Sequence, residues 1–283
     1  MVDAERAPSS YWQPHERDEL ERRLAEIAGD TVGGWSFAVA ERGAVAGVER
    51  NLVRHAASTI KVPLLLAVLA GTADGTHQLD DTVAVPVERT AGSGVLRALS
   101  SITALRLDET LELMVTVSDN TATNMLIDLL GLESIEARLG EMGLTNTRLR
   151  RHMLDQRAAE AGRDNVATAG ELAWLLDRLC GTELLPAELA DTALHMLGRQ
   201  QFNDRMPAYL PADVVSLHKT GELSGVCHDV GIMCFDDRQV AFAAMSSDLP
   251  DADGTANGVG PAVAAIGAAA RTVVEVARGS RSR

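Results

Sequence analysis

A chain of 283 residues can form one large domain or two small ones, with an ample core in either case. Its hydrophobic content of 46% and charged content of 23% are those of an ordinary soluble protein. The formal net charge of −14, without any run of Lys or Arg, argues against nucleic acid and anionic membrane as partners, because like charges repel.

The N-terminal part predicts a helix followed by a hairpin. Apolar residues recur at helical spacing over 15–28. The segments 35–40 and 44–50 predict two strands of a β-hairpin, with an Arg-Gly turn between them. An apolar helix follows Ser58 and ends near 71–75.

The middle of the chain predicts helices at 108–130, 134–142, 168–180 and 185–200. Residues 144–167 show no clear period and predict a long loop.

Strands return near the C-terminus at 214–219, 226–235 and 239–246, with a turn at Asp236-Asp237, and a Gly/Ala-rich helix closes the chain over 258–277. Strands at both ends with helices between them predict an α+β fold, in which one antiparallel sheet is built from both ends of the chain.

We expect a single unit over 1–283. It would comprise an α/β lobe at about 15–57 and 205–280, with flanking helices, and an all-helical lobe at about 58–204.

Three cysteines occur, Cys180, Cys227 and Cys234, and their spacing matches neither a zinc site nor a redox pair. We therefore expect free thiols, no metal and no cofactor. Residues 1–23 lack a charged segment followed by an apolar run, so no secretory signal is expected. As written, the chain is expected to be a cytoplasmic monomer without a membrane span. It would be secreted or periplasmic if a leader was removed before the numbering begins.

Three short motifs carry the chemistry, in the order Ser58-Thr59-Ile60-Lys61, Ser118-Asp119-Asn120 and Lys219-Thr220-Gly221. Positions i and i+3 share one face of a helix, so the Ser58 hydroxyl and the Lys61 amine can meet. If Ser58 opens the helix, the helix N-terminus favours negative charge that develops there. Each motif alone is weak, since such short patterns occur by chance.

The use of lysine strengthens this interpretation. Lys61 and Lys219 are the only two lysines, and every other Lys/Arg-type cation is arginine. A guanidinium stays protonated, whereas an ammonium can lose its proton when it is desolvated or lies beside another cation. A base beside a serine must be able to lose that proton, so both lysines are predicted to be functional.

The three motifs in this order resemble those of class A β-lactamases and penicillin-binding proteins. The flanking text is also similar, namely HAASTIKVPLL and LMVTVSDNTATNMLI. The resemblance extends from about Trp35 to the C-terminal helix and implies a β-lactamase-like fold and a serine hydrolase.

For catalysis, the resemblance implies that Ser58 attacks a carbonyl and becomes acylated. Lys61 would take or relay the serine proton. Ser118 would hydrogen-bond Lys219 and pass a proton to the departing nitrogen.

For binding, the resemblance implies that Asn120 holds Lys61 and the side-chain amide of the substrate. Lys219, Thr220 and Gly221 would receive the substrate carboxylate. The backbone N–H groups of Ser58 and Glu222 would form the oxyanion hole.

The 148–156 loop departs from the family, which carries there a glutamate that activates water for deacylation. Arg151 and Asp164 match the pair that usually clamps this loop. Counting forward from Arg151, the glutamate position falls on Met153, and a thioether cannot act as a base. Asp155 is a possible substitute base, with a solvated or structural carboxylate as the alternative.

The arginine that often helps to bind the substrate carboxylate is not evident after the third motif. His228 is a candidate replacement, with a packed or solvated histidine as the alternative.

The sequence thus predicts an enzyme that forms an acyl-enzyme on Ser58 with a small-molecule β-lactam, amide or ester, with slow deacylation. Two alternatives stay open, because fold alone does not choose among them. One is an intracellular esterase, peptidase or acyltransferase that uses the same Ser-Lys dyad. The other is a non-catalytic sensor domain that stays acylated.

Overall fold

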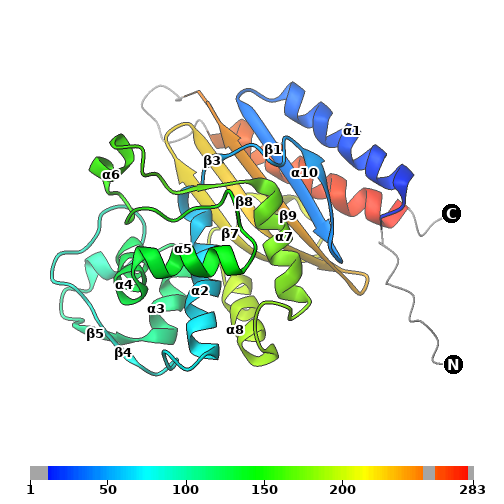
Figure 1. Cartoon of the computed structure of the whole chain (residues 1–283). Coiled ribbons are helices and arrows are strands. Elements are labelled where there is room, and N and C mark those ends of the chain that lie inside the picture. The colour runs from blue at the N-terminus through cyan, green and yellow to red at the C-terminus, as the bar shows by residue number, and fades with distance from the viewer. Residues whose placement is uncertain (1–11, 251–258, 280–283) are drawn as a thin grey trace, which may run out of the picture.

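The computed structural model describes residues 12–250 and 259–279. A five-stranded antiparallel sheet has the order β2-β1-β9-β8-β7 (Figure 1). Its strands are β1 (Gly34–Glu41), β2 (Ala44–Val48), β7 (Val215–Leu223), β8 (Val226–Phe235) and β9 (Arg238–Ser247). The N-terminal strand β1 pairs with β9, which confirms a sheet built from both ends of the chain.

Helices cover both faces of this sheet. The terminal helices α1 (Pro14–Asp30) and α10 (Val259–Gly279) lie side by side on one face (Figure 1). Helix α7 (Ala169–Cys180) packs on the opposite face of β1 and β9. Because successive strand residues point to opposite faces, Phe37 enters the core beneath α1 and α10, whereas Ala38 enters the core beneath α7.

Helix α10 is long and apolar enough to cross a membrane, by length and composition. Its most apolar window is 61% buried inside the protein, where it packs against α1 and the sheet. This pattern is that of a core helix.

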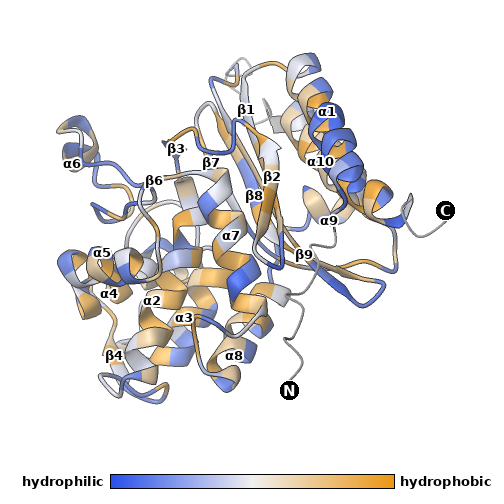
Figure 2. Ribbon diagram, turned by 45° about the vertical axis from the view of Figure 1, so that its right-hand side comes forward, coloured by the Kyte–Doolittle hydropathy of each residue, from blue (hydrophilic) through white to orange (hydrophobic). Residues whose placement is uncertain are grey.

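Several helices pack around α2 (Lys61–Ala73), which Figure 2 colours as strongly hydrophobic. Its segment from Leu64 to Leu69 is fully buried. The packing partners of α2 include α3 (Leu107–Thr116), α4 (Asn120–Leu130), α5 (Leu132–Glu141) and α8 (Ala187–Gly198). Shorter elements complete the order: β3 (Arg54–His55), η1 (Ala57–Ile60), β4 (Thr82–Ala84), η2 (Leu96–Ala98), β5 (Ala104–Arg106), α6 (Gln156–Glu160), β6 (Val166–Ala167) and α9 (Met206–Tyr209).

Two sequence-based expectations need correction. The predicted helix 108–130 is two helices, α3 and α4, because Ser118 has a φ of +55° and Asp119 caps a new helix. The predicted loop 144–167 contains α6 and β6, which are too short to produce a recognisable period. The division into two lobes stays a prediction.

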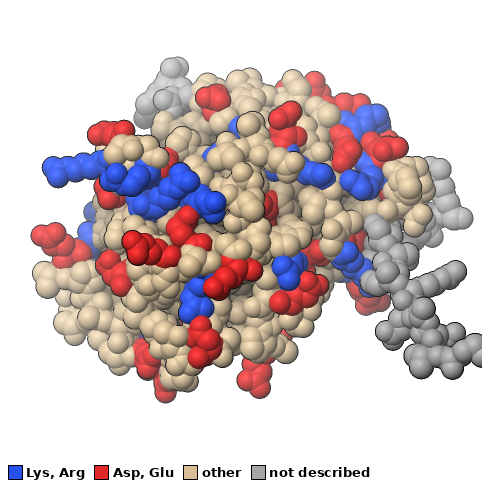
Figure 3. All heavy atoms as spheres, viewed as in Figure 1, with Lys and Arg blue, Asp and Glu red and all other residues tan. Residues whose placement is uncertain are grey.

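Figure 3 shows one face of the protein, over which acidic side chains are spread, in keeping with the net charge. On the face shown in Figure 3, the basic side chains gather mainly over the 148–163 loop and α6, where Arg150, Arg157 and Arg163 are exposed.

Candidate active site

Ser58 lies on the 3₁₀ turn η1, directly before α2. The condition that Ser58 opens the α-helix is not met, because α2 begins at Lys61 and Ser58 precedes it by one short turn. Ser58 is partly exposed, whereas Lys61 is fully buried. The Ser58 side chain is thus accessible to a ligand, while the Lys61 amine is shielded from water.

The Lys61 amine joins the first two motifs. Its Nζ lies 2.7 Å from the backbone oxygen of Ser118, 3.0 Å from Ser118 Oγ and 2.9 Å from Asn120 Oδ1. As a neutral amine, Nζ keeps two N–H donors for the carbonyl and amide oxygens. Its lone pair can then accept the Ser118 hydroxyl proton.

Burial holds the pKa of Lys61 well below its ordinary value, and the nearby Lys219 cation acts in the same direction. Asp119 opposes this shift. The lowered pKa favours the neutral amine, and a base beside a serine has to be neutral.

The second motif is held in an unusual backbone conformation. Ser118 has positive φ, and the buried Asp119 carboxylate fixes the turn by accepting hydrogen bonds from the amides of Ala122, Val95 and Leu96 at 3.0, 2.7 and 2.9 Å. Strained backbone of this kind is common at functional sites. Here it directs both Ser118 oxygens towards Lys61.

Asn120 links this turn to the preceding loop. Its Nδ2 donates to the oxygen of Ala91 at 3.0 Å, and its backbone amide donates to the oxygen of Ser93 at 3.0 Å. The side chain is thereby oriented so that Oδ1 is presented to Lys61.

The third motif lies on β7 and packs against η1. A Cβ atom on Gly221 would lie 3.0 Å from Thr59 Cγ2 and 3.2 Å from the Thr59 amide nitrogen. Only a residue without a side chain lets β7 approach the turn that carries Ser58 so closely.

Lys219 is fully buried, and its Nζ donates to the oxygen of Thr220 at 2.9 Å. The expected hydrogen bond from Ser118 is not made among the described residues, because Ser118 Oγ faces Lys61. Burial lowers the pKa of Lys219 to about 7, although Asp229 opposes the shift.

The loop after α5 is clamped as its sequence predicts. Arg151 Nη2 and Nε lie 2.7 and 2.8 Å from Asp164 Oδ1. Burial raises the pKa of Asp164, but hydrogen bonds from Arg151 and Asn165 outweigh burial and leave this pKa below its ordinary value. Asp164 Oδ2 also contacts His55 Nδ1.

The backbone of Met153 is hydrogen-bonded to a side chain on α4. Its amide donates to Asn124 Oδ1 at 2.7 Å, and its backbone oxygen accepts from Asn124 Nδ2 at 3.4 Å. The side chain is buried in the apolar core. The next side chain, Leu154, lies near Asn120, since a Cβ on Gly92 would touch both.

Asp155 is engaged in local structure. Its carboxylate accepts a hydrogen bond from the amide of Ala158 at 3.0 Å and caps α6. Its role as a deacylation base stays a prediction, and this cap would have to break for the carboxylate to act elsewhere.

The candidate His228 is buried and neutral. Its Nδ1 accepts from the amide of Ser246 at 3.1 Å, and its Nε2 donates to the oxygen of His55 at 2.8 Å. Burial lowers the pKa of His228 to about 4, so this ring does not supply a cation for a substrate carboxylate.

Sequence reasoning missed Arg205, a cation beside the third motif. Arg205 is almost fully buried, and its Nη1 donates to the oxygens of Gly221 and His228 at 2.8 Å each. It precedes Lys219 in the chain and lies just before α9, so no local pattern marks it.

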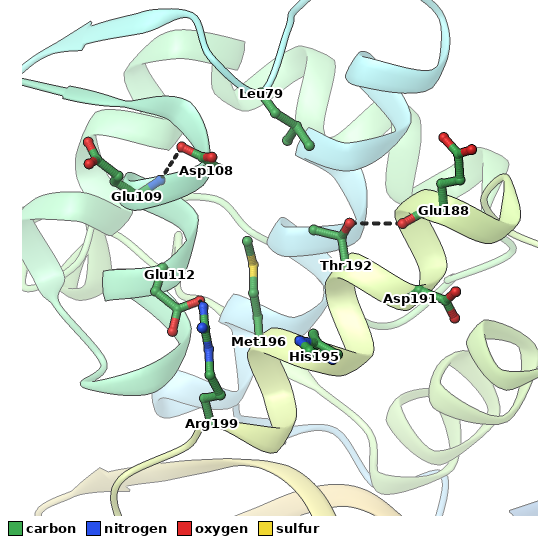
Figure 4. A pocket seen from close by; sticks show the side chains of 10 residues that line it. All are labelled: Leu79, Asp108, Glu109, Glu112, Glu188, Asp191, Thr192, His195, Met196 and Arg199. Carbon is green, nitrogen blue, oxygen red and sulfur yellow. Dashed lines mark hydrogen bonds and ion pairs between the residues drawn. The ribbon is translucent and has the colours of Figure 1, made fainter.

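A separate acidic pocket of about 500 Å³ lies between α3 and α8 (Figure 4). Glu109, Glu112, Glu188 and Asp191 line it, and Arg199 bonds Glu112 at 2.5 Å. No residue of the three motifs lies there.

Comparisons with known proteins agree with the motifs. A model of the β-lactamase enzyme family matches residues 18–277. A β-lactamase from Sphaerobacter thermophilus is 29% identical, with a TM-score of 0.82 over 92% of this chain and 97% of that chain. An ancestral class A β-lactamase is 25% identical, with a TM-score of 0.81 over 90% of this chain and 99% of that chain.

The protein PBP-A is 26% identical, with a TM-score of 0.80 over 93% of this chain and 96% of that chain. A leucine-to-glutamate mutant of PBP-A, solved as an acyl-enzyme complex with penicillin G, is 25% identical. No curated protein sequence matches the chain. The family match spans most of the chain, and a serine-lysine site sits on the expected fold. The chain therefore belongs to the β-lactamase enzyme family.

Proposed function

We propose that this enzyme is acylated on Ser58 by β-lactams or related amides and esters, and that it releases the acyl group slowly. The observation that carries the proposal is the Lys61 amine, which is buried, easily deprotonated and held between Ser118 and Asn120. Ser58 precedes this amine by three residues and is partly exposed, and a serine that shares a helical face with such an amine can be activated as a nucleophile.

In acylation, Ser58 Oγ attacks the carbonyl carbon and its proton passes to Lys61 Nζ. The backbone N–H groups of Ser58 and Glu222 stabilise the oxyanion, where losing a single donor costs about 10²–10³ in rate. The carbonyl–nitrogen bond then breaks. Ser118 gives its proton to the departing nitrogen and recovers a proton from Lys61, so the site returns to its starting protonation state with an ester on Ser58.

Deacylation needs a base aimed at a water molecule, and Met153 stands where the resemblance places that base. General-base assistance is worth about 10²–10⁴ in rate, so its loss makes ester hydrolysis the slow step. In the mutant of PBP-A that was solved as an acyl-enzyme with penicillin G, glutamate replaces a leucine. Introducing glutamate in place of Met153 is the corresponding test in this protein.

The test is stopped-flow kinetics with a good penicillin, together with intact-protein mass spectrometry. We expect a burst of acylation followed by slow turnover and a long-lived adduct. Met153→Glu should accelerate release by about tenfold or more, while Met153→Gln, which is similar in shape but has no base, should not.

Asp155→Asn tests the competing base. A trapped acyl-enzyme in this variant would assign deacylation to Asp155. Fast turnover without a burst, unchanged in Asp155→Asn, would overturn the proposed slow step.

A further inference from the structure

The third motif is followed directly by a carboxylate of the protein itself. Glu222 follows Gly221 on β7, and its Oε2 forms an ion pair with Arg205 Nη2. Because side chains alternate along a strand, Glu222 and Thr220 project from the same face of β7. The Glu222 carboxylate thus lies beside Thr220, one of the residues that the family resemblance assigns to the substrate carboxylate.

Arg205 has little capacity left for another anion. Its Nη1 donates to two backbone oxygens, its Nη2 pairs with Glu222, and its buried Nε has no hydrogen-bond partner. Asp204 Oδ1 lies 3.7 Å from that Nε. The Arg205 side chain is only 5% exposed, whereas Glu222 is 49% exposed and faces solvent.

The lysines supply incomplete positive charge at this end of the site. Burial lowers the pKa of Lys219 to about 7 and holds the pKa of Lys61 well below its ordinary value. At neutral pH, Lys219 is therefore only partly protonated. The lysines would therefore only partly offset the repulsion between the exposed Glu222 anion and an incoming carboxylate.

From this geometry we infer that Glu222 is a specificity-determining residue, and that the preferred acyl donor is neutral or positively charged where it faces Thr220 and Glu222. The Glu222 carboxylate occupies Arg205, which a substrate carboxylate would otherwise pair with, and its negative charge disfavours anionic substrates. A site can select a partner in this way, by repelling the alternative. This inference rests on the proposed acylation of Ser58.

The test compares benzylpenicillin with its methyl ester, which differ only at the carboxyl group, where esterification removes the charge and adds a methyl group. The rate constant for Ser58 labelling is measured by mass spectrometry for each compound. The quantity of interest is the acid-to-ester ratio of these rates in the wild type and in Glu222→Gln.

We expect this ratio to rise at least about tenfold in Glu222→Gln, because a unit charge near the ligand is removed. High salt should reduce the difference between the two proteins. Asp204→Asn is the matched control, since it removes a carboxylate near Arg205 that is 64% exposed and lies outside the motifs. Its ratio should stay within about threefold of the wild type.

An unchanged ratio in Glu222→Gln, with Ser58 labelled, would overturn the inference and leave the proposed function standing. An equal rise in Asp204→Asn would also overturn it, because the effect would then reflect net charge. Failure of both compounds to label Ser58 in every folded variant would overturn the proposed function, and this inference with it. Thermal unfolding verifies that each variant is folded.

Discussion

At the scale of single residues, the chain separates two uses of positive charge. Arginines form the ion pairs with defined geometry, such as Arg238 with Glu41 and Arg151 with Asp164. The two lysines are both fully buried and both have lowered pKa values. A buried guanidinium would keep its proton, so lysine is the cation that a proton-transfer site requires.

Lys61→Arg tests this distinction. We expect it to reduce the rate of Ser58 labelling by at least about 10²-fold, because guanidinium cannot accept the serine proton. Lys219→Arg should be milder, since that position mainly supplies charge near the substrate. Labelling is followed by mass spectrometry, with thermal unfolding as the folding control. A folded Lys61→Arg enzyme labelled at the native rate would contradict the role assigned to Lys61.

The lowered pKa of Lys219 also makes stability depend on pH. Its value is about 7 in the folded protein and its ordinary value is 10.5. Between these values the unfolded chain binds more protons, so the free energy of unfolding contributed by Lys219 rises with pH. Below the folded-state pKa, both states hold the proton and the contribution becomes constant.

We therefore expect the free energy of unfolding to rise less in Lys219→Met than in the wild type between about pH 7 and about pH 8.5. Denaturant titrations at the two pH values measure this rise. All other ionisable side chains are common to both proteins, and losing the Lys219 charge also removes one cause of the lowered Lys61 pKa, so the difference reports Lys219 together with its effect on Lys61. Equal rises would show that Lys219 keeps its ordinary pKa.

At the scale of elements, the ion pair between Arg151 and Asp164 clamps the loop between α5 and β6. The Arg151 and Asp164 side chains are 14% and 17% exposed, so removing one leaves the other charge poorly compensated. Asn165 adds to the clamp, because its Oδ1 accepts from the amides of Arg150 and Arg151.

Asp164→Ala should lower the free energy of unfolding by about 1–3 kcal/mol, measured by chemical denaturation. The control is Glu183→Ala, which breaks the more exposed pair with Arg178 and should cost about 0–1 kcal/mol. Equal effects of the two substitutions would show that the clamp contributes no more than a surface pair.

At the scale of the whole molecule, the candidate site depends on the approach of β7 to η1, the turn that precedes α2. Gly221→Ala would place a Cβ 3.0 Å from Thr59 Cγ2 and 3.2 Å from a backbone nitrogen, so the two segments must move apart by a few tenths of an ångström. We expect the Ser58 labelling rate to fall about tenfold or more while the fold is kept, since reaction rates are sensitive to small displacements.

Gly140→Ala is the control for this prediction, because a Cβ there meets open space on α5. It should leave labelling unchanged and preserve or slightly raise stability. Native labelling in Gly221→Ala would show that the spacing between β7 and η1 is not critical.

Local sequence determined the elements and the motifs. The strand β8 matches its predicted bounds, because an apolar run ends at Asp236-Asp237, where both residues take positive φ in the turn. The short motifs predict Ser58, Lys61 and Lys219 as site residues, since serine acylation requires a hydroxyl and an amine that can lose its proton. The break between α3 and α4 had a local signal too, the good cap Asp119, but helical periodicity on both sides obscured it.

Only the tertiary structure decided how these pieces act together. The burial of the two lysines, and hence their lowered pKa values, depends on neighbours far away in the chain. Arg205 reaches the site through contacts with Gly221 and Glu222, 16 and 17 residues away. Periodicity and propensity describe only neighbours along the chain, so desolvation and charge pairing between distant segments become visible only once the chain has folded.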